Sequence, residues 1–156
     1  MRLEYFDIID RVEVFDVKNG HVETSSTIPE QSTVFEGHFP GYPVMPGVLL
    51  LEMMNHTSGY LLLGLHNFSR LPFFAGAKKV KIRRFVTPGM VIRAKCQLIH
   101  EGSGFCITQN EIRDQDGEPV ADAELTMMVM DFPSPELPQL VMERAKAHGV
   151  SPGMTA

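Results

Sequence analysis

The chain has 156 residues, 44% of them apolar, and a formal net charge of −5. This length fits one domain, and the composition matches globular averages, which excludes a disordered chain, a collagen and a coiled coil. The acidic balance argues against a general nucleic-acid-binding protein, and two cysteines are too few for a disulfide framework. The first residues contain no apolar signal region, so we expect a protein of the reducing cytoplasm.

The first predicted element is a β-hairpin. Residues 8–28 alternate apolar and polar side chains, and Asn19-Gly20 is a strong signal for a two-residue turn. Residues 29–39 are expected to form a loop. Prolines then keep the chain extended up to Pro46, which suits the first turn of a helix because its missing N–H costs nothing there.

A long helix is predicted to follow and to end near Leu65. Its residues are apolar on most of the circumference, so it should be buried nearly all round. Residues 48–65 are numerous enough to cross a bilayer, but they include Glu52 and His56, and an ionised group at bilayer depth is costly. We therefore expect a buried helix in a soluble domain and no membrane span.

From residue 73 onward the apolar pattern has a period of two, which predicts about four antiparallel strands that end near residue 132. A sheet whose helical mass lies between its second and third strands must wrap around that helix to bury it. The predicted fold class is therefore α+β, a hot-dog fold with an antiparallel β-sheet wrapped around one long central α-helix.

Residues 1–132 are expected to form this domain, and residues 133–156 a C-terminal extension. Three prolines between positions 133 and 138 end the last strand. Residues 137–148 are predicted to form a short exposed helix that stops at Gly149, and residues 150–156 a frayed tail.

The most informative segment is HFPGYPVMPGV, residues 38–48, followed by Glu52. It places His38 in a loop made rigid by proline and glycine that leads into a helix N-terminus, where free N–H groups and the helix dipole suit a developing oxyanion. Gly47 leaves its own amide sterically open. Glu52 lies in apolar sequence, so burial is expected to raise its pKa and allow it to act as a general acid. Such groups suit proton abstraction beside a thioester carbonyl. A capping loop with a surface histidine is the alternative, which the density of proline and glycine disfavours.

This segment, with Glu52 fourteen residues after His38, resembles the signature of the FabZ-type 3-hydroxyacyl-[acyl-carrier-protein] dehydratases. Further similar stretches occur at residues 74–76, 86–89 and 120–125, and the resemblance covers about residues 8–130. Glutamate at position 52 favours the FabZ type over the related dehydratase-isomerase, which has aspartate there.

The resemblance implies reversible dehydration of a (3R)-3-hydroxyacyl thioester, carried on the phosphopantetheine of an acyl carrier protein, to the trans-2-enoyl thioester. His38 would take the C2 proton, and Glu52 would protonate or orient the departing C3 hydroxyl. The Gly47 amide would bind the thioester carbonyl, and the Val44 carbonyl would hold the His38 tautomer. The resemblance also implies a homodimer that pairs His38 of one subunit with Glu52 of the other, and often a trimer of dimers.

The sequence departs from the family at His56, where glutamine is usual. One helical turn after Glu52, His56 can shift the proton affinity of the carboxyl in either direction. The N-terminus and the longer tail differ as well, so the substrate and the pathway, fatty-acid synthesis or a related lipid pathway, stay open. The other histidines (His21, His66, His100, His148) share no ligand spacing; we interpret them as surface or turn residues and expect no metal and no cofactor.

Half of the basic residues fall within residues 78–95, a window without acids. One interpretation is a solvated strand protected against edge pairing. The other is a docking surface for an acidic acyl carrier protein. We hypothesise that the carrier docks on Lys78, Lys79, Lys81, Arg83 and Arg84.

Two other functions are weighed against the dehydratase. A hot-dog thioesterase would use Glu52 for attack on the carbonyl carbon, but it would leave His38 unexplained. A non-catalytic acyl-binding subunit is disfavoured because both catalytic positions are filled.

Overall fold

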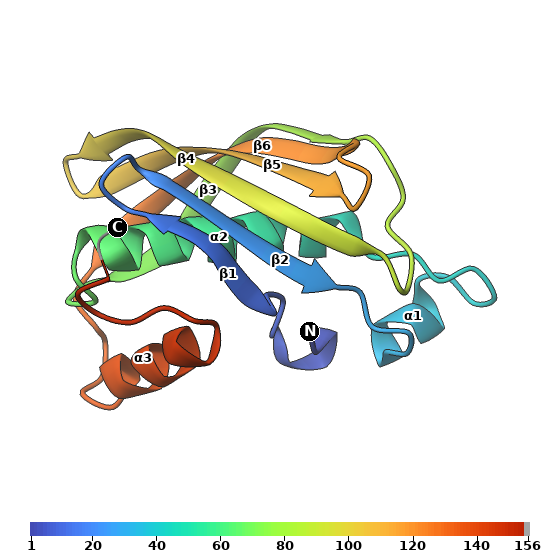
Figure 1. Cartoon of the computed structure of the whole chain (residues 1–156), viewed down its shortest axis with the longest axis horizontal. Helices are drawn as coiled ribbons and strands as arrows, with labels where there is room; N and C mark the ends of the chain where they lie inside the picture. Colours follow the sequence, from blue (N-terminus) through green and yellow to red (C-terminus); the bar gives the residue numbers. More distant parts are fainter. Residues whose placement is uncertain (155–156) are drawn as a thin grey trace.

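Six antiparallel strands form one sheet in the computed structural model, which describes residues 1–154. The strands are β1 (Arg11–Asp16), β2 (His21–Thr27), β3 (Leu71–Ile82), β4 (Val91–Gly102), β5 (Phe105–Asp114) and β6 (Pro119–Met130). Their spatial order is β1-β2-β4-β5-β6-β3, so β1 and β3 are the edges. Helix α2 (Gly47–Leu65) joins β2 to β3 and packs against one face of the sheet (Figure 1). The predicted α+β hot-dog fold is confirmed.

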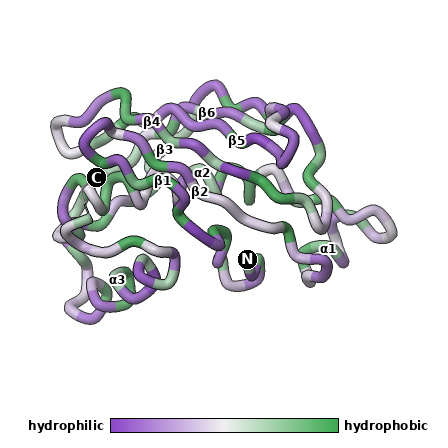
Figure 2. Tube along the Cα trace, in the orientation of Figure 1, coloured by the Kyte–Doolittle hydropathy of each residue, from purple (hydrophilic) through white to green (hydrophobic). Residues whose placement is uncertain are grey.

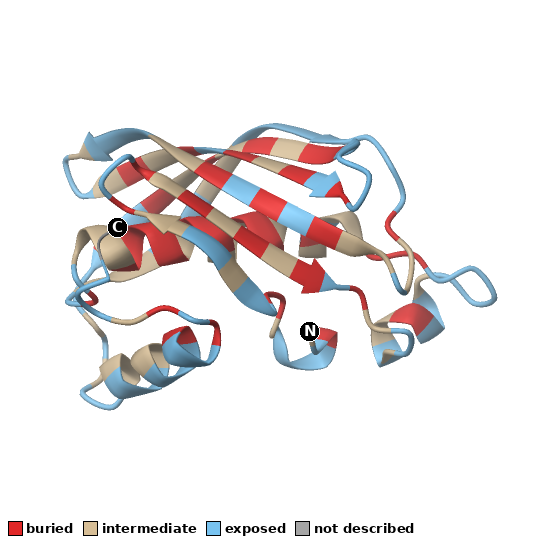
Figure 3. Ribbon diagram, in the orientation of Figure 1, coloured by how far each residue is buried: buried red, intermediate tan, exposed pale blue. Residues whose placement is uncertain are grey.

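The core lies between the sheet and α2. Along the inner strands, buried residues alternate with partly buried or exposed ones (Figure 3). The sheet likewise contains both hydrophobic segments, green in Figure 2, and hydrophilic ones, purple. Five large side chains of α2 are almost fully buried: Leu50, Met53, Met54, Leu61 and Leu62. No helix in residues 1–154 combines the length and the apolar character needed to cross a membrane.

Buried hydroxyl groups fix the position of α2 against the sheet. The Thr57 hydroxyl lies 2.8 Å from that of Thr24 on β2. Ser58 donates a 3.0 Å hydrogen bond to the side-chain oxygen of Asn110, and its oxygen lies 2.9 Å from the Thr108 hydroxyl. A buried polar group is costly without a partner, so these pairs restrict the rotation and the sliding of α2.

Two boundaries differ from the prediction. Strand β3 begins at Leu71 rather than at residue 73, and includes Pro72; β3 tolerates this proline because it is an edge strand. The segment predicted as loop 29–39 contains the short helix α1 (Thr33–Gly37), whose Val34 amide donates to the capping Ser32 hydroxyl.

The C-terminal extension packs on the domain. Helix α3 (Leu137–Ala147) forms where it was predicted, below the C-terminal half of α2 in Figure 1. It is not simply exposed, because Val141 and Met142 pack against the core and Ala145 is fully buried. Val150 is only 1% exposed, so the expectation of a frayed tail is wrong at this residue, and positions 155–156 lie outside the described residues. The division of the chain at residue 132 stays a prediction.

Candidate active site

His38 caps the C-terminus of α1, at the start of the loop that leads to α2. Its Nδ1 lies 2.8 Å from the Val44 carbonyl oxygen, and the Val44 N–H donates to the His38 carbonyl at 2.9 Å. A carbonyl oxygen only accepts hydrogen bonds, so Nδ1 carries the hydrogen and Nε2 is left as a free acceptor. The imidazole is therefore held in the tautomer that a general base requires.

The loop around His38 is fixed by its own contacts. The Tyr42 N–H donates to the Phe39 carbonyl at 2.9 Å, which closes the tip, and the Met45 N–H donates to the Val86 carbonyl at 2.7 Å. The Phe39 ring stacks on the imidazole with 4.3 Å between the ring centroids. These contacts orient the ring independently of any ligand.

Gly47 is the first residue of α2, and Pro46 is the N-cap rather than part of the first turn. Among the described residues, no acceptor is paired with the Gly47 N–H, so this amide is free at the positive end of the helix dipole. A Cβ at position 47 would collide with the Ile82 side chain of β3. Glycine thus lets the helix start pass directly beside β3.

Glu52 lies in the second turn of α2 and has two partners on the same helix. Its Oε1 is 2.8 Å from His56 Nε2, and its Oε2 accepts a 3.1 Å hydrogen bond from Asn55 Nδ2. The side chains of Glu52 and His56 are both about one quarter exposed, at 29% and 26%. The pair lies at the surface of the single chain, on the face of α2 that the sheet leaves open.

The charge state of Glu52 differs from the prediction. Burial raises its pKa and is the largest single influence, but the hydrogen bond and charge of His56 and the hydrogen bond of Asn55 together hold the pKa below its ordinary value. In the single chain, Glu52 is therefore an ionised carboxylate near neutral pH rather than a protonated acid. The expectation of a raised pKa is wrong because the neighbouring donors outweigh desolvation.

The site residues form two separate groups. His38 and Val44 meet in the loop, with the Gly47 amide at the end of the same segment, whereas Glu52 and His56 meet on α2. Within residues 1–154, no hydrogen bond or ion pair joins His38 to Glu52. The catalytic roles of these residues stay predictions.

The five basic residues of the predicted docking surface are exposed on β3 and the segment after it. Three of them have acidic partners on β6 or β5: Lys79 with Glu124, Arg83 with Asp122, and Arg84 with Asp114. In the part of the chain that the structure describes, Lys78 and Lys81 have no ion-pair partner. Much of the positive charge of this surface is thus locally compensated.

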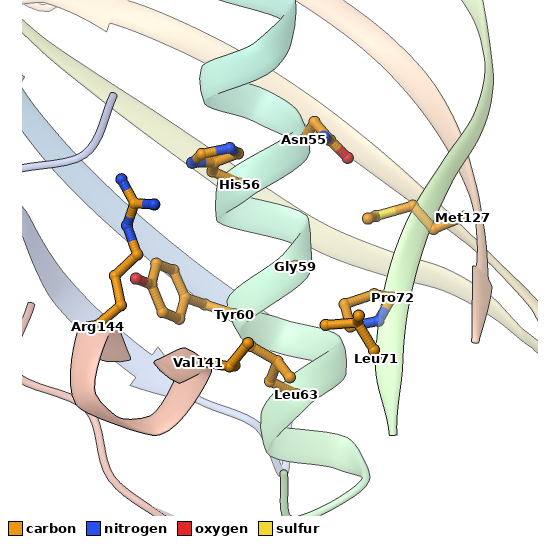
Figure 4. A pocket seen from close by; sticks show the side chains of 10 residues that line it. All are labelled: Asn55, His56, Gly59, Tyr60, Leu63, Leu71, Pro72, Met127, Val141 and Arg144. Carbon is orange, nitrogen blue, oxygen red and sulfur yellow. The ribbon is translucent and has the colours of Figure 1, made fainter. Parts of the chain in front are cut away.

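A pocket of about 230 Å³ lies beside Asn55 and His56, the two partners of Glu52. It runs along α2 between the start of β3 and α3, and Figure 4 shows its lining side chains. Sequence reasoning did not identify Asn55, Tyr60 or Arg144, which line this pocket. Asn55 follows Glu52 by three positions, a spacing that brings side chains together on a helix, whereas Arg144 reaches the pocket only through the tertiary packing of α3.

His148 is buried, contrary to its interpretation as a surface residue. The Tyr60 hydroxyl and His148 Nδ1 lie 2.5 Å apart, and burial lowers the pKa of His148 despite the nearby Asp7 carboxylate.

Among the described residues, no cluster of histidine, cysteine, aspartate and glutamate has the arrangement of a metal site.

Comparison with known proteins defines the family. A FabA-like domain matches residues 2–124. The chain is 37% identical over 123 residues to the 3-hydroxyacyl-[acyl-carrier-protein] dehydratase FabZ of Latilactobacillus sakei, covering 78% of this chain and 86% of that one. It is 37% identical over 126 residues to the FabZ of Ligilactobacillus salivarius, with the same two coverages. The chain therefore belongs to the FabA-like family and is a homologue of the FabZ dehydratases.

Solved structures support the fold. A hypothetical thioesterase protein of Streptococcus pneumoniae TIGR4, crystallised with coenzyme A, superposes with a TM-score of 0.63 at 18% identity, covering 80% of this chain and 88% of that one. At this identity the likeness concerns the hot-dog fold and not the reaction.

Proposed function

We propose that this protein is a (3R)-3-hydroxyacyl-[acyl-carrier-protein] dehydratase that forms trans-2-enoyl thioesters in fatty-acid or related lipid biosynthesis. The observation that carries the proposal is the hydrogen bond from His38 Nδ1 to the Val44 carbonyl. It leaves Nε2 as a base in a rigid loop beside a helix start with a free amide. The kinship with FabZ dehydratases supports the same reaction.

In the proposed mechanism, His38 Nε2 removes the proton from C2 of the thioester. Negative charge then develops on the thioester carbonyl oxygen, and the Gly47 N–H at the start of α2 donates to it. The C–H bonding electrons form the C2–C3 double bond as the C3–O bond breaks. Water leaves when the departing hydroxyl receives one proton, so the proton taken at C2 balances the proton given at C3.

The Glu52 group supplies the proton at C3. Because the pKa of Glu52 is held low, the carboxylate first accepts a hydrogen bond from the C3 hydroxyl and orients it. Glu52 Oε1 and His56 Nε2 lie 2.8 Å apart, which is within reach of a direct proton transfer. A proton held by His56 can therefore reach the leaving oxygen through Glu52.

The complete site is proposed to need a homodimer, in which His38 of one subunit faces Glu52 of the other; a trimer of dimers is a further possible assembly. Large apolar side chains, each at least 40% exposed, lie on edge strand β3, on the segment after it and on the His38 loop. They are Phe39, Tyr42, Phe73, Phe74, Val80, Ile82 and Phe85. An exposed apolar edge strand is a template for pairing with another chain, and a second copy would cover this surface.

An acyl carrier protein with a phosphopantetheine-linked acyl chain is the proposed partner. Lys78 and Lys81 are the residues best suited to meet its acidic surface, because neither has an ion-pair partner among residues 1–154. We expect Lys78→Glu with Lys81→Glu to raise the KM for carrier-bound substrate at low salt. The KM for a substrate on N-acetylcysteamine, a minimal thiol without carrier, should stay unchanged. An unchanged KM for both would refute docking at these two residues.

One assay tests the reaction. A 3-hydroxydecanoyl thioester is incubated with the protein while enoyl absorbance and free thiol are followed separately. Enoyl product without thiol release supports the dehydratase, thiol release supports a thioesterase, and neither product supports a binding subunit. His38→Ala and Glu52→Gln should each reduce turnover by at least about a thousandfold, whereas the surface variants His100→Ala and Glu118→Gln serve as controls. Near-normal turnover in either site variant would refute its assigned role.

A further inference from the structure

The pocket beside α2 is polar at one end and apolar at the other. His56 and Asn55, the two partners of Glu52, lie at one end in Figure 4, and Leu63, Leu71 and Val141 lie at the other. The two ends are separated by about two turns of α2, from position 55 to position 63. A ligand that enters from Glu52 thus passes from hydrogen-bonding groups to hydrocarbon.

Gly59 keeps the middle of this pocket open. Helix α2 contains three glycines, and a Cβ at either Gly47 or Gly64 would collide with a neighbouring side chain. At Gly59 the nearest atom, Pro72 Cγ, would be 3.9 Å from an added Cβ, an ordinary contact. Glycine is unfavourable inside a helix relative to alanine, and packing does not require it here. In Figure 4 Gly59 lies between the two groups of lining side chains, where any larger residue would enter the pocket.

The polar end holds an acceptor without a partner. Asn55 Oδ1 is buried and, among the described residues, receives no hydrogen bond, although Nδ2 of the same amide donates to Glu52. A buried acceptor without a donor is destabilising. A ligand hydroxyl beside Glu52 would supply that donor.

The C-terminal extension forms one wall of the pocket, in which Val141 lies beside Leu63 at the apolar end and Arg144 lies beside Tyr60 (Figure 4). Val141 and Arg144 of α3 line the pocket, and both lie beyond residues 2–124, which the family domain matches. Arg144 is tied to the N-terminal segment by a 2.9 Å hydrogen bond to Asp7 Oδ1. The contact between Tyr60 and His148 holds the end of α3 against α2. This wall is thus anchored at two points.

We propose that this pocket binds the distal end of the acyl chain and that α3 closes it, which makes the extension the determinant of chain length. The proposal rests on the dehydratase function proposed above. A 3-hydroxyacyl chain is polar at C1 to C3 and apolar beyond, as the pocket is along its length. Since an apolar cavity of about 150 Å³ holds benzene, about 230 Å³ has room for a chain end of roughly six to nine carbons. The preferred substrate is therefore of medium length.

The test compares kcat/KM for 3-hydroxydecanoyl and 3-hydroxybutyryl thioesters of N-acetylcysteamine. Gly59→Leu fills the middle of the pocket, and Val141→Trp fills its far end. Each methylene excluded from an apolar pocket costs about fourfold, so both variants should lower the decanoyl-to-butyryl ratio at least tenfold. Leu140→Trp is the matched control, because Leu140 precedes Val141 on α3 but is 59% exposed; it should keep the wild-type ratio.

Binding measurements separate this proposal from the dehydratase function. Calorimetric titration with decanoyl- and butyryl-N-acetylcysteamine, which cannot be dehydrated, reports the pocket alone. Weaker decanoyl binding by Gly59→Leu and Val141→Trp supports the pocket even if the wild-type protein dehydrates neither substrate. An unchanged ratio and unchanged binding in both variants would overturn the pocket, whatever the activity. Dissociation of the wild-type assembly by both variants in size-exclusion chromatography would also overturn it, because the groove would then be a contact between subunits.

Discussion

Each of the two carboxylate oxygens of Glu52 contacts a nitrogen of a neighbouring side chain. His56 and Asn55 contact Oε1 and Oε2 from the same helix, one turn away or less. Glutamine at position 56 would donate a hydrogen bond without a titratable charge. In this chain an imidazole occupies that position, so the carboxylate is paired with a side chain that can carry a positive charge.

We expect His56→Gln to raise the pKa of Glu52. The charge of His56 and its hydrogen bond lower this pKa. Glutamine removes the charge, so less remains to oppose burial, which raises the pKa. Titration of the Glu52 side-chain carbon by NMR measures the change directly, and the acidic limb of the pH profile of kcat/KM should move to higher pH.

His100→Gln is the control for this titration, because His100 is exposed on β4 and is not paired with Glu52. It should leave the Glu52 pKa in place. A Glu52 pKa that falls or stays constant in His56→Gln would contradict the coupling of the two side chains.

The motif predicted the local contacts of single residues, such as that of His38 with the Val44 carbonyl, better than their charge states. His38, Val44 and Gly47 lie in one short segment, and their geometry follows from a loop that the sequence already makes rigid. The direction in which the Glu52 pKa is shifted depends on partial burial, which raises it, and on two hydrogen-bond donors, which lower it. Spacing brings His56 within reach, but only coordinates decide which influence dominates.

At the level of elements, helix α2 has two interior glycines, Gly59 and Gly64, which differ in the space available for a side chain. At Gly64 an added Cβ would lie 2.5 Å from Val17 Cγ2 and 2.6 Å from Phe15 Cζ. At Gly59 the space is open. Substitution by alanine should thus have opposite effects on stability at Gly59 and at Gly64.

We expect Gly59→Ala to raise the free energy of unfolding by about 0.5–1 kcal/mol, the gain in helix propensity. Gly64→Ala should lower it by about 1–2 kcal/mol, because overpacking against two core side chains exceeds that gain. Urea unfolding of both variants, followed by circular dichroism, measures the difference. Equal effects of the two substitutions would contradict the packing described for α2.

The order and type of the main elements could be predicted because their patterns are local. The helix from Gly47 to Leu65 and the strands after it follow from periodicity and turn residues. Helix α1 is only five residues long, too short for a periodic signal. The start of β3 was predicted late because Pro72 argues against a central strand, and sequence does not tell which strand lies at an edge.

At the level of the whole molecule, the C-terminal extension is held by a polar cluster that joins three distant segments. Arg144 and His148 from the extension meet Asp7 from the N-terminal segment and Tyr60 from α2. No local pattern predicts such a cluster, because its members lie up to 141 positions apart. Its contacts explain why the extension is packed on α2 rather than free.

We expect the packing of α3 to weaken as the pH falls. Burial, the largest influence, holds the pKa of His148 below its ordinary value of 6.5. The unfolded state therefore binds more protons, and the His148 contribution is complete above 6.5 and is lost as the pH falls toward the lowered value. Asp7 acts in the same direction at lower pH. Burial is the largest single influence and raises its pKa, but the hydrogen bonds of Arg144 and Arg2 and the charge of Arg144 together hold the pKa below its ordinary value.

Hydrogen exchange of the α3 amides at about pH 7.5 and about pH 5.5 measures this effect. Burial raises the pKa of Tyr60 to about 12, so its hydroxyl stays protonated throughout. Tyr60→Phe leaves buried His148 without this partner and should destabilise the packing of α3 by about 1–3 kcal/mol at either pH. Equal exchange in wild type and variant would refute the contribution of this pair.

At the scale of the assembly, the separation of His38 from Glu52 within one chain bears on the proposed dimer. Among residues 1–154 of one chain, no hydrogen bond or ion pair joins the two groups, so the proposed dimer takes one residue from each subunit at every site. Subunit mixing tests this requirement. His38→Ala and Glu52→Gln are each expected to be inactive as homodimers. Unfolded together in equal amounts and refolded, they should recover about a quarter of wild-type activity, because half of the dimers are mixed and each has one intact site of two.

Refolding each variant alone is the control. No recovery from a mixture shown to contain mixed dimers would place both residues of a site in the same subunit and end the shared-site mechanism.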